Sequence, residues 1–375
     1  MRSFGVEEEF LLVNAQTGEH AAVAENLLAG AAAEKAGRSR RGACSTTPTL
    51  GNTLTAEAQR EQVEAVSAPF TGLSDLAAAL RQGRAEADRQ AMVFGATIAA
   101  LGTSPLPALP HLFQTPRYRA MDERFGLALR EQLMCGFHVH VSVDSPEEGV
   151  AVLDRIRIWL PVLIGLSSNS PFWQGKDTGY ASFRYQVWRR WPTAGPTEIF
   201  GSAQAYHDLV EMLLSCNVLL DEGMIYFDAR LSATYPTVEI RVPDVCTEPE
   251  HAVALAAIAR ALVETAATDW AEGKPPPAVP AEMIRLASWR ASRFGLQDAL
   301  IHPTLNRPRP AKACVRALLD HIGPALTDTG DRTLVEGTVE QILAGGTGAC
   351  RQRTVFDSSG NFRKVLLDAA ERTTA

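Results

Sequence analysis

Hydrophobic and polar positions alternate in three separated stretches of the chain, which predicts three β-strands. Residues 4–13 alternate loosely, residues 135–143 alternate strictly, and residues 237–242 repeat the pattern. Successive side chains of a strand point to opposite faces, so every second residue shares a face. Three further runs have the length and composition of strands: residues 60–66, 95–101 and 225–229.

Apolar residues spaced three and four positions apart predict a set of amphipathic helices. These helices are expected at residues 25–36, 73–93, 117–133, 147–169 and 203–216. The fourth of them should be interrupted or bent near Pro161, because proline cannot donate the helical hydrogen bond. From about residue 248 onward the chain is predicted to be mostly helical. Strands mixed with helices, without regular βαβ alternation, predict an α+β fold with a largely antiparallel sheet. We expect one domain over residues 1–375.

Two segments lack a clear period and are predicted as loops. Residues 37–53 are rich in Gly, Arg, Ser and Thr, and residues 170–200 are rich in Gly, Pro, Trp and Arg. A loop as long as the second is usually functional or disordered, and its aromatic residues argue against disorder. The part from Ser170 to Arg184 is interpreted as a loop that closes over phosphates or substrate.

Composition excludes several classes of function. The chain has 375 residues, a net charge of −7 and a pI of about 5.7, so a nucleic acid is not the expected partner. The apolar run from Ile156 to Leu166 is too short to cross a bilayer, and no signal-peptide pattern is present. The six cysteines are scattered without a CxxC pair, which argues against structural zinc and a disulfide scaffold. We expect a cytoplasmic protein, with a homo-oligomer possible.

The first strand carries three consecutive glutamates in otherwise apolar surroundings. Glu7 and Glu9 should share one face, and Glu8 should take the other, next to a cation. Two carboxylates on one face repel each other unless a cation lies between them. The ordinary alternative is a solvated strand face, but glutamate is disfavoured in strands.

The second strand places His138 and His140 on one face, with Phe137, Val139 and Val141 directed to the core. A His-x-His pair can supply metal ligands, or one ligand and one phosphate contact. Taken alone, such a pair is more often a structural feature.

The third strand repeats this arrangement with Glu239 and Arg241, for which an ion pair across the sheet is the ordinary explanation. The recurrence on three strands is the informative observation. Glu57, Glu61 and Glu64 lie around the strand at 60–66, and carboxylates converging from several strands favour a hard cation with oxygen ligands. Zinc would require Cys and more His.

The sequence contains neither a Walker A loop nor a GxGxxG motif, so any nucleotide must be bound by a phosphate site of another type. Residues 345–353 offer glycine amides together with Arg351 and Arg353. The alternative for this segment is a helix–turn linker with solvent-facing arginines.

Taken together, these segments resemble the carboxylate–amine ligases of the type 2 glutamate–cysteine ligase family, a branch of the glutamine synthetase-like superfamily. The matching stretches are Gly5 to Leu12, Glu57 to Glu64, Arg117-Tyr118, Cys135 to Val143, Ser170 to Arg184, Trp191 to Gly195, Tyr235 to Asp244, and Arg351 to Arg353. The resemblance implies an antiparallel sheet curved into a half-barrel around two or more Mg²⁺ ions, with Mn²⁺ possible, and flanked by helices.

The resemblance also implies roles for particular residues. The implied metal ligands are Glu7, Glu9, Glu57, Glu64, His138 and Glu239. His140 would lie beside the nucleotide, and Arg241 would contact the transferred phosphate or the substrate carboxylate. The implied polyphosphate or acid-substrate contacts are Arg184, Arg351 and Arg353.

The resemblance implies an enzyme that uses ATP to convert a carboxylate, such as that of an amino acid, into an acyl phosphate that an amine then attacks. Such a reaction needs Mg²⁺ and arginines around the phosphates and no nucleophilic Ser or Cys. Glu61 is a candidate general base. Two alternatives are a guanidino kinase-like phosphoryl transferase and a non-catalytic relative that binds a nucleotide or metabolite.

Overall fold

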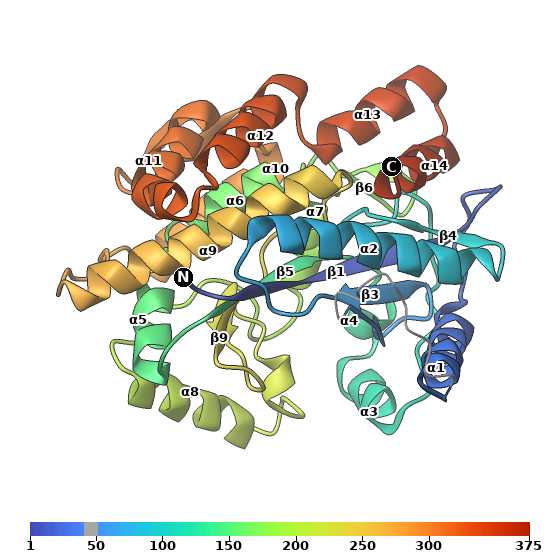
Figure 1. Cartoon of the computed structure of the whole chain (residues 1–375), viewed down its shortest axis with the longest axis horizontal. Coiled ribbons are helices and arrows are strands. Elements are labelled where there is room, and N and C mark those ends of the chain that lie inside the picture. Colours follow the sequence, from blue (N-terminus) through green and yellow to red (C-terminus); the bar gives the residue numbers. More distant parts are fainter. Residues whose placement is uncertain (41–51) are drawn as a thin grey trace.

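A computed structural model describes residues 1–40 and 52–375, and its centre is an open antiparallel sheet (Figure 1). The strand order is β2–β3–β1–β5–β9–β8, and β4 also pairs with β1. The strands are β1 (Phe4–Asn14), β2 (Thr53–Ala56), β3 (Gln62–Val66), β4 (Ala96–Ala99), β5 (Phe137–Ser142), β8 (Ala229–Leu231) and β9 (Thr237–Ile240). The predicted α+β class with an antiparallel sheet flanked by helices is confirmed.

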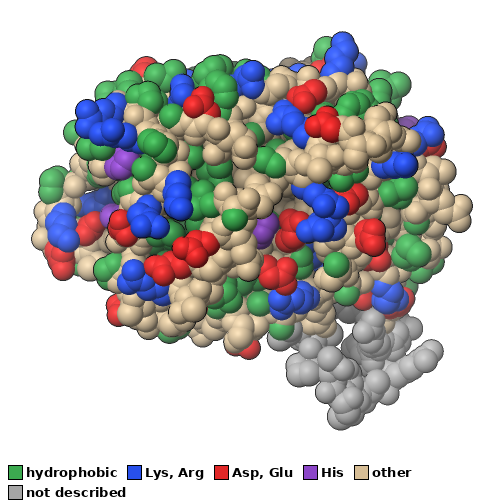
Figure 2. Space-filling view, turned by 90° about the horizontal axis from the view of Figure 1, so that it is seen from above, with side chains coloured by type: hydrophobic (Ala, Val, Ile, Leu, Met, Phe, Trp, Pro, Cys, Tyr) green, Lys and Arg blue, Asp and Glu red, His purple; other side chains and the backbone are tan. Residues whose placement is uncertain are grey.

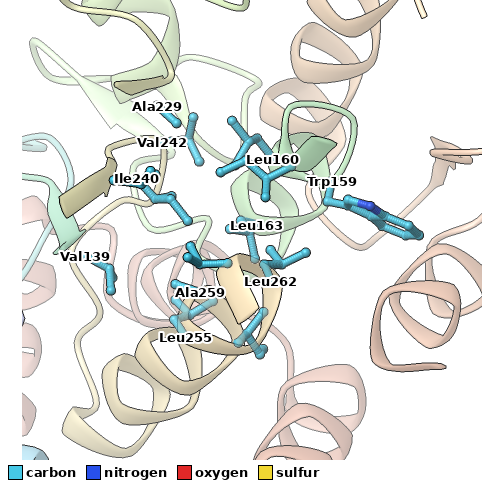
Figure 3. Packing of buried hydrophobic residues seen from close by; sticks show 14 of the residues in the cluster. Val139, Trp159, Leu160, Leu163, Ala229, Ile240, Val242, Leu255, Ala259 and Leu262 are labelled. Carbon is cyan, nitrogen blue, oxygen red and sulfur yellow. The ribbon is translucent and has the colours of Figure 1, made fainter. Parts of the chain in front are cut away.

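Helices cover one face of this sheet. Figure 1 shows α2 (Leu73–Met92) and α9 (Pro249–Ala271) running across it, and α5 (Pro146–Ile156) packs against α9. The inward-facing Phe137, Val139 and Val141 are at most 1% exposed, as the alternation predicted. In Figure 3, Leu255, Ala259 and Leu262 of α9 pack between these strands and α6 (Leu160–Leu166).

By length and composition, α9 is apolar enough to cross a membrane, but 78% of its most apolar window is buried inside the protein. Its apolar surface is therefore used within the core, between the sheet and α11 (Ala311–Thr329) and α12 (Arg332–Gly345). The face of the molecule shown in Figure 2 carries acidic and basic side chains that are interspersed.

Several predicted boundaries were wrong for local reasons. Helix α1 (Ala24–Arg40) includes residues 37–40, which were expected in a loop; residues 41–51 of that loop lie outside the described residues. The helix expected at 117–133 is divided into α3 (Pro116–Phe125) and α4 (Leu127–Arg130), because Gly126 between them has a φ of +52°. By contrast, the predicted interruption near Pro161 is confirmed, because the helix expected at 147–169 is divided into α5, which ends at Ile156, and α6, which begins at Leu160.

The strand expected at 225–229 was also misplaced. A 3₁₀ turn, η1 (Glu222–Met224), precedes it, and β8 begins only at Ala229. The predicted long loop contains the short strands β6 (Phe172–Trp173) and β7 (Lys176–Asp177) and the helix α7 (Phe183–Trp188). Ser170, Ser182 and Arg184, at the two ends of the segment expected to close over a ligand, are at most 2% exposed, and that closure stays a prediction.

The remaining elements complete the helical layer around the sheet. The helix α8 (Ala203–Ser215) packs against α5, and the hairpin of β10 (Ala299–Ile301) and β11 (Pro308–Pro310) interrupts the C-terminal half that was predicted to be mostly helical. The other C-terminal helices are α10 (Ala281–Phe294), α13 (Gly348–Ser359) and α14 (Phe362–Thr373).

Candidate active site

Strand register brings the ionisable residues of the three predicted strands together on the face of the sheet opposite α2 and α9. Glu7 of β1 lies opposite His138 of β5, and Glu9 of β1 lies opposite Glu64 of β3. On the other side of β5, Glu239 lies opposite His140. Directly opposite residues have Cβ atoms about 4.5–5.5 Å apart, so this register alone gathers their side chains.

These residues line one cavity of about 350 Å³. Every metal ligand implied by the sequence contributes to its wall: Glu7, Glu9, Glu57, Glu64, His138 and Glu239. His140, Arg184 and Arg241 line it too. We call the part of the cavity formed by these glutamates and histidines the acidic end.

Glu8 lies on the opposite face of β1, as predicted. Its carboxylate accepts two hydrogen bonds from Arg84 of α2, at 2.6 and 3.1 Å, and both residues are 1% exposed. Arg84 also donates to the carbonyls of Cys246 and Thr247. Of the three consecutive glutamates, Glu7 and Glu9 therefore line the cavity, and Glu8 forms a structural ion pair.

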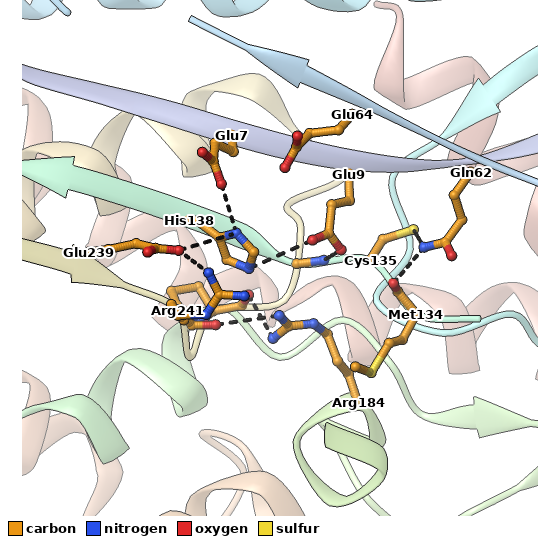
Figure 4. A network of polar contacts seen from close by, with 12 residues as sticks. Glu7, Glu9, Gln62, Glu64, Met134, Cys135, His138, Arg184, Glu239 and Arg241 are labelled. Atoms are coloured by element: carbon orange, nitrogen blue, oxygen red, sulfur yellow. Dashed lines mark hydrogen bonds and ion pairs between the residues drawn. The ribbon is translucent and has the colours of Figure 1, made fainter. Parts of the chain in front are cut away.

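His138 lies at the centre of the acidic end (Figure 4). Its Nδ1 is 3.1 Å from Glu7 and 4.0 Å from Glu239, and its Nε2 is 3.7 Å from Glu9 without a hydrogen-bond partner. Burial, assisted by the charge of Arg241, lowers the pKa of His138 to about 4, so the ring is neutral at neutral pH. We assign its proton to Nδ1, which donates to Glu7, and this leaves the Nε2 lone pair facing Glu9.

Among the described residues, two groups of side chains have ligand atoms within 4.8 Å of one another, and both groups contain His138. The first group is Glu9, Glu64 and His138, and the second is Glu7, Glu239 and His138. A neutral imidazole offers one lone pair, so it can ligate an ion in only one group. The tautomer assigned above gives that ligand to the group with Glu9 and Glu64.

The negative charge of the glutamates in the acidic end exceeds the positive charge of the arginines beside them. Burial and the charges of Glu9 and Glu7 raise the pKa of Glu57 to about 8, and burial with Glu57 and Glu7 raises the pKa of Glu64 well above its usual range. For Glu7, burial acts to raise the pKa, but hydrogen bonds from His138 and His140 hold it below its usual range. A divalent cation would remove this repulsion, and the Nε2 atom of His138, which has no hydrogen-bond partner, supplies a further ligand atom.

The donor set fits a hard cation. Carboxylate oxygens are the ligands that Mg²⁺ and Mn²⁺ prefer, and Mn²⁺ accepts an imidazole more readily. The described lining of the cavity contains no cysteine, so the thiolate ligands of a structural zinc site are missing from it.

Arg241 and Arg230 both bind Glu239. Arg241 contacts one carboxylate oxygen, and the Nε of Arg230 donates to the other at 2.7 Å. Burial and the nearby charge of Arg230 lower the pKa of Arg241 to about 10. Arg230 was missed because the strand that carries it was predicted to end at Ala229. Its position opposite Glu239 follows from the register of β8 and β9, which the alternation within one strand does not give.

Arg184 lines the cavity, but its guanidinium donates hydrogen bonds to main-chain carbonyls. It donates to the carbonyls of Val242 and Pro243 at 3.3 and 3.0 Å, and it lies 4.0 Å from Asp244. Asp244 in turn accepts hydrogen bonds from Ser170 and Ser182. We therefore interpret Arg184 as a support for the end of β9 and for Arg241, in place of the phosphate contact expected from the sequence.

Three other candidates lie away from the cavity. Arg351 forms an ion pair with Asp368, and Arg353 forms one with Asp177 at the surface. The structure does not bring either arginine to the acidic end. Glu61 is 3% exposed and accepts a hydrogen bond from the main chain of His111, so it points away from the cavity and was a wrong choice of general base.

Comparisons with known proteins agree with this arrangement. A family model described as glutamate–cysteine ligase family 2 matches residues 3–368. A Streptomyces avermitilis protein provisionally named glutamate–cysteine ligase 2-1 is 46% identical over 373 residues, covering 100% of this chain and 99% of its own. A Streptomyces coelicolor protein provisionally named glutamate–cysteine ligase 2 is 47% identical over 375 residues, covering 100% of both chains.

Two solved structures share the fold at low sequence identity. A glutamate–cysteine ligase from Francisella tularensis in complex with AMP matches with a TM-score of 0.69 and 15% identity, covering 100% of this chain and 88% of that one. A bifunctional glutathione synthetase from Pasteurella multocida matches with a TM-score of 0.67 and 16% identity, covering 100% of this chain and 52% of that one.

Proposed function

Because the chain belongs to glutamate–cysteine ligase family 2, we propose that it is an ATP-dependent ligase that joins a carboxylate to an amine in this cavity. The observation that carries the proposal is the acidic end, where five glutamates from four segments surround His138. Such a concentration of buried carboxylate is unfavourable unless cations and phosphates occupy it. The finer proposal is that the acid is an amino acid such as glutamate and that the amine is an amino acid such as cysteine.

The chemistry requires activation of a poor electrophile. A carboxylate oxygen of the acid attacks the γ-phosphorus of ATP, the bond to ADP breaks, and an acyl phosphate forms. The amine nitrogen then attacks the acyl carbon and the amide bond forms, while phosphate leaves with the carbon–oxygen electron pair and takes up the proton that the amine nitrogen loses. Mg²⁺, when bound by the carboxylates and His138, would offset charge on the phosphate oxygens.

The protein residues supply position and charge. Glu7, Glu9, Glu57, Glu64 and Glu239 would hold the ions. Arg241, exchanging its contact with Glu239 for the phosphoryl group, would stabilise the negative charge that develops during transfer.

His140 lies 3.2 Å from Glu7 and 3.0 Å from the hydroxyl of Thr237, at the edge of the acidic end. This position suits the contact with the nucleotide that was expected from the sequence. Arg184 would keep the main chain of Arg241 in place.

The experiment is a coupled measurement of ADP and free phosphate with ATP, Mg²⁺ and a panel of acids and amines. Release of both products that depends on the amine supports the ligase. ADP without free phosphate, together with a stable phosphorylated product, would indicate a phosphoryl transferase, and no turnover with any pair would favour a binding protein.

A matched pair of variants connects the activity to the acidic end. Glu9→Gln should abolish phosphate release because it removes a proposed ion ligand, whereas Glu123→Gln, at an exposed position of α3, should behave as the wild type. Full activity of Glu9→Gln would contradict the assignment of the ion ligands.

A further inference from the structure

Arg241 is the arginine that the proposed mechanism brings to the phosphoryl group, and the helix α7 contacts it twice. Nη2 of Arg184 donates to the carbonyl of Arg241 at 3.4 Å (Figure 4), and the ring centroid of Trp188 lies 5.1 Å from the guanidinium carbon of Arg241. To exchange Glu239 for a phosphoryl group, the side chain of Arg241 has to turn on a main chain that stays in place. The position of that main chain therefore matters for the transfer.

The main-chain N–H of Arg241 is held from the other side, by the start of β8. It donates to the carbonyl of Asp228 at 3.0 Å, which extends the pairing of Ala229 with Ile240 by one residue. The N–H of Asp228 donates in turn to the carbonyl of Gly195 at 2.9 Å. The location of Asp228 therefore sets where the main chain of Arg241 lies.

The side chain of Asp228 connects this strand end to α7. Its carboxyl is 2% exposed, and the hydroxyl of Tyr185, which is 1% exposed, lies 3.0 and 3.3 Å from the two carboxyl oxygens. Tyr185 follows Arg184 in α7, so two adjacent residues of one helix reach the two sides of the main chain of Arg241. Because both groups are buried, water cannot replace either partner unless the chain moves.

The environment of Asp228 favours an uncharged carboxyl. Burial raises the pKa of Asp228 to about 7, against the hydrogen bond from Tyr185 and the positive charges of Arg189, at the end of α7, and Arg285 of α10. Burial and the charge of Asp228 raise the pKa of Tyr185 well above its usual range. Above pH 7 the buried carboxylate has to draw in water or move, and either change loosens the start of β8.

We propose that the hydrogen bond between Tyr185 and Asp228 positions Arg241 for phosphoryl transfer by holding the start of β8 against α7. Both are positioning residues, because neither belongs to the described lining of the cavity. The inference rests on the proposed ligase function and deepens it. It names what keeps the transferring arginine in place, and it makes turnover fall as Asp228 ionises.

Amide hydrogen exchange at Arg241, which needs no turnover, tests the positioning directly. Tyr185→Phe keeps the ring and removes the hydroxyl, and it should speed exchange of the Arg241 N–H by about fivefold to tenfold. Tyr206→Phe is the matched control, because Tyr206 is 4% exposed and its hydroxyl accepts a hydrogen bond from the N–H of Leu231, at the other end of β8. It should speed exchange at Leu231 and leave Arg241 unchanged. Equal exchange at Arg241 in Tyr185→Phe and the wild type would overturn the inference.

Kinetics then connect this hydrogen bond to Arg241. Tyr185→Phe should lower kcat by about tenfold to a hundredfold and leave the KM for ATP and for the acid unchanged, because the lost positioning matters in the transition state. In an Arg241→Lys background the same change should have little further effect, because the guanidinium that is positioned is already gone. An equal loss of kcat in both backgrounds, or equal losses in Tyr185→Phe and Tyr206→Phe, would show a general structural role and overturn the inference while the ligase remains.

The pH profile supplies the last readout. The kcat of the wild type should fall above about pH 7 as Asp228 ionises, whereas Asp228→Asn should show no such fall. Asparagine stays neutral and keeps an oxygen that accepts from the hydroxyl of Tyr185. A fall in Asp228→Asn that parallels the wild type would contradict the role of Asp228. If no pair of substrates gives turnover, the ligase proposal fails, and unchanged exchange at Arg241 in Tyr185→Phe would still separately overturn the positioning.

Discussion

Glu8 and Glu9 are adjacent in sequence, and the structure gives their glutamine variants opposite expected phenotypes. Glu8 and Arg84 are both 1% exposed, and Arg84 also bonds to the main chain of Cys246, Thr247 and Thr373. Glu8→Gln leaves this guanidinium without a charged partner. Breaking a buried ion pair from one side costs about 3–5 kcal/mol of the free energy of unfolding.

Glu9→Gln should have no such cost. In the protein without a cation, the charge of Glu9 raises the pKa values of Glu57 and Glu64, so the neutral amide relieves repulsion. Glutamine also keeps an oxygen that can accept the hydrogen bond from the main-chain N–H of Gly136, which is 2.6 Å long in the wild type. We expect the metal-free Glu9→Gln variant to be as stable as the wild type or more stable.

The assay is thermal unfolding of both variants and the wild type, with and without Mg²⁺. With an entropy of unfolding of about 2.1 cal/mol/K per residue, the loss in Glu8→Gln corresponds to a Tm lower by about 4–6 °C. Mg²⁺ at a hundred times its Kd should stabilise the wild type and Glu8→Gln by about 2.7 kcal/mol, and Glu9→Gln much less. Equal Tm values for Glu8→Gln and the wild type, or full Mg²⁺ stabilisation of Glu9→Gln, would refute the assignment of the two faces of β1.

Three further expectations concern the site and its surroundings. Gly136→Ala should abolish phosphate release, since its Cβ would lie 2.1 Å from Nη2 of Arg184 and 2.9 Å from Nε2 of His138; retention of wild-type kcat/KM would contradict the packing. Burial raises the pKa of Asp228 to about 7, although a hydrogen bond from Tyr185 opposes the shift. Because the unfolded carboxyl loses its proton near pH 4, folding stability falls as pH rises from about 4 to 7. Asp228→Asn should remove up to about 3 kcal/mol of this dependence between pH 5 and 8, measured as Tm, and parallel Tm curves for the two proteins would contradict the expectation. Chelation of divalent cations should stop ADP release, and addition of Mg²⁺ or Mn²⁺ should restore it. ADP release that persists in excess chelator would disprove this expectation.

The faces of the strands could be predicted from the sequence alone. The direction of a side chain on a strand depends on local geometry, with a period of two residues. Glu7 and Glu9 were therefore separated correctly from Glu8, and Glu239 and Arg241 were placed together on one face. Family resemblance, which adds information from other chains, selected Glu57 and Glu64 from among the remaining acidic residues.

Element boundaries and loop paths were harder to predict. Gly126 divides one predicted helix, and Pro161 lies at the break in another. The local pattern predicted the interruption near Pro161 but missed the one at Gly126. The segment from Ser170 to Arg184 has the composition of a mobile loop, yet its two ends are buried through hydrogen bonds to Asp244, a residue far along the chain.

Only the tertiary structure decided which charged groups share the cavity. Arg351 and Arg353 have the residue type expected of phosphate contacts, but the path of α13 places them in ion pairs elsewhere. Arg230 enters the cavity from a segment that carried no motif, and Arg117 enters it from a stretch that only the family resemblance had singled out. Strand alternation is fixed by covalent geometry within a few residues, whereas register and helix placement depend on packing between distant segments. The sequence therefore determined the two faces of the acidic strand, and the packing of the whole chain determined which residues surround it.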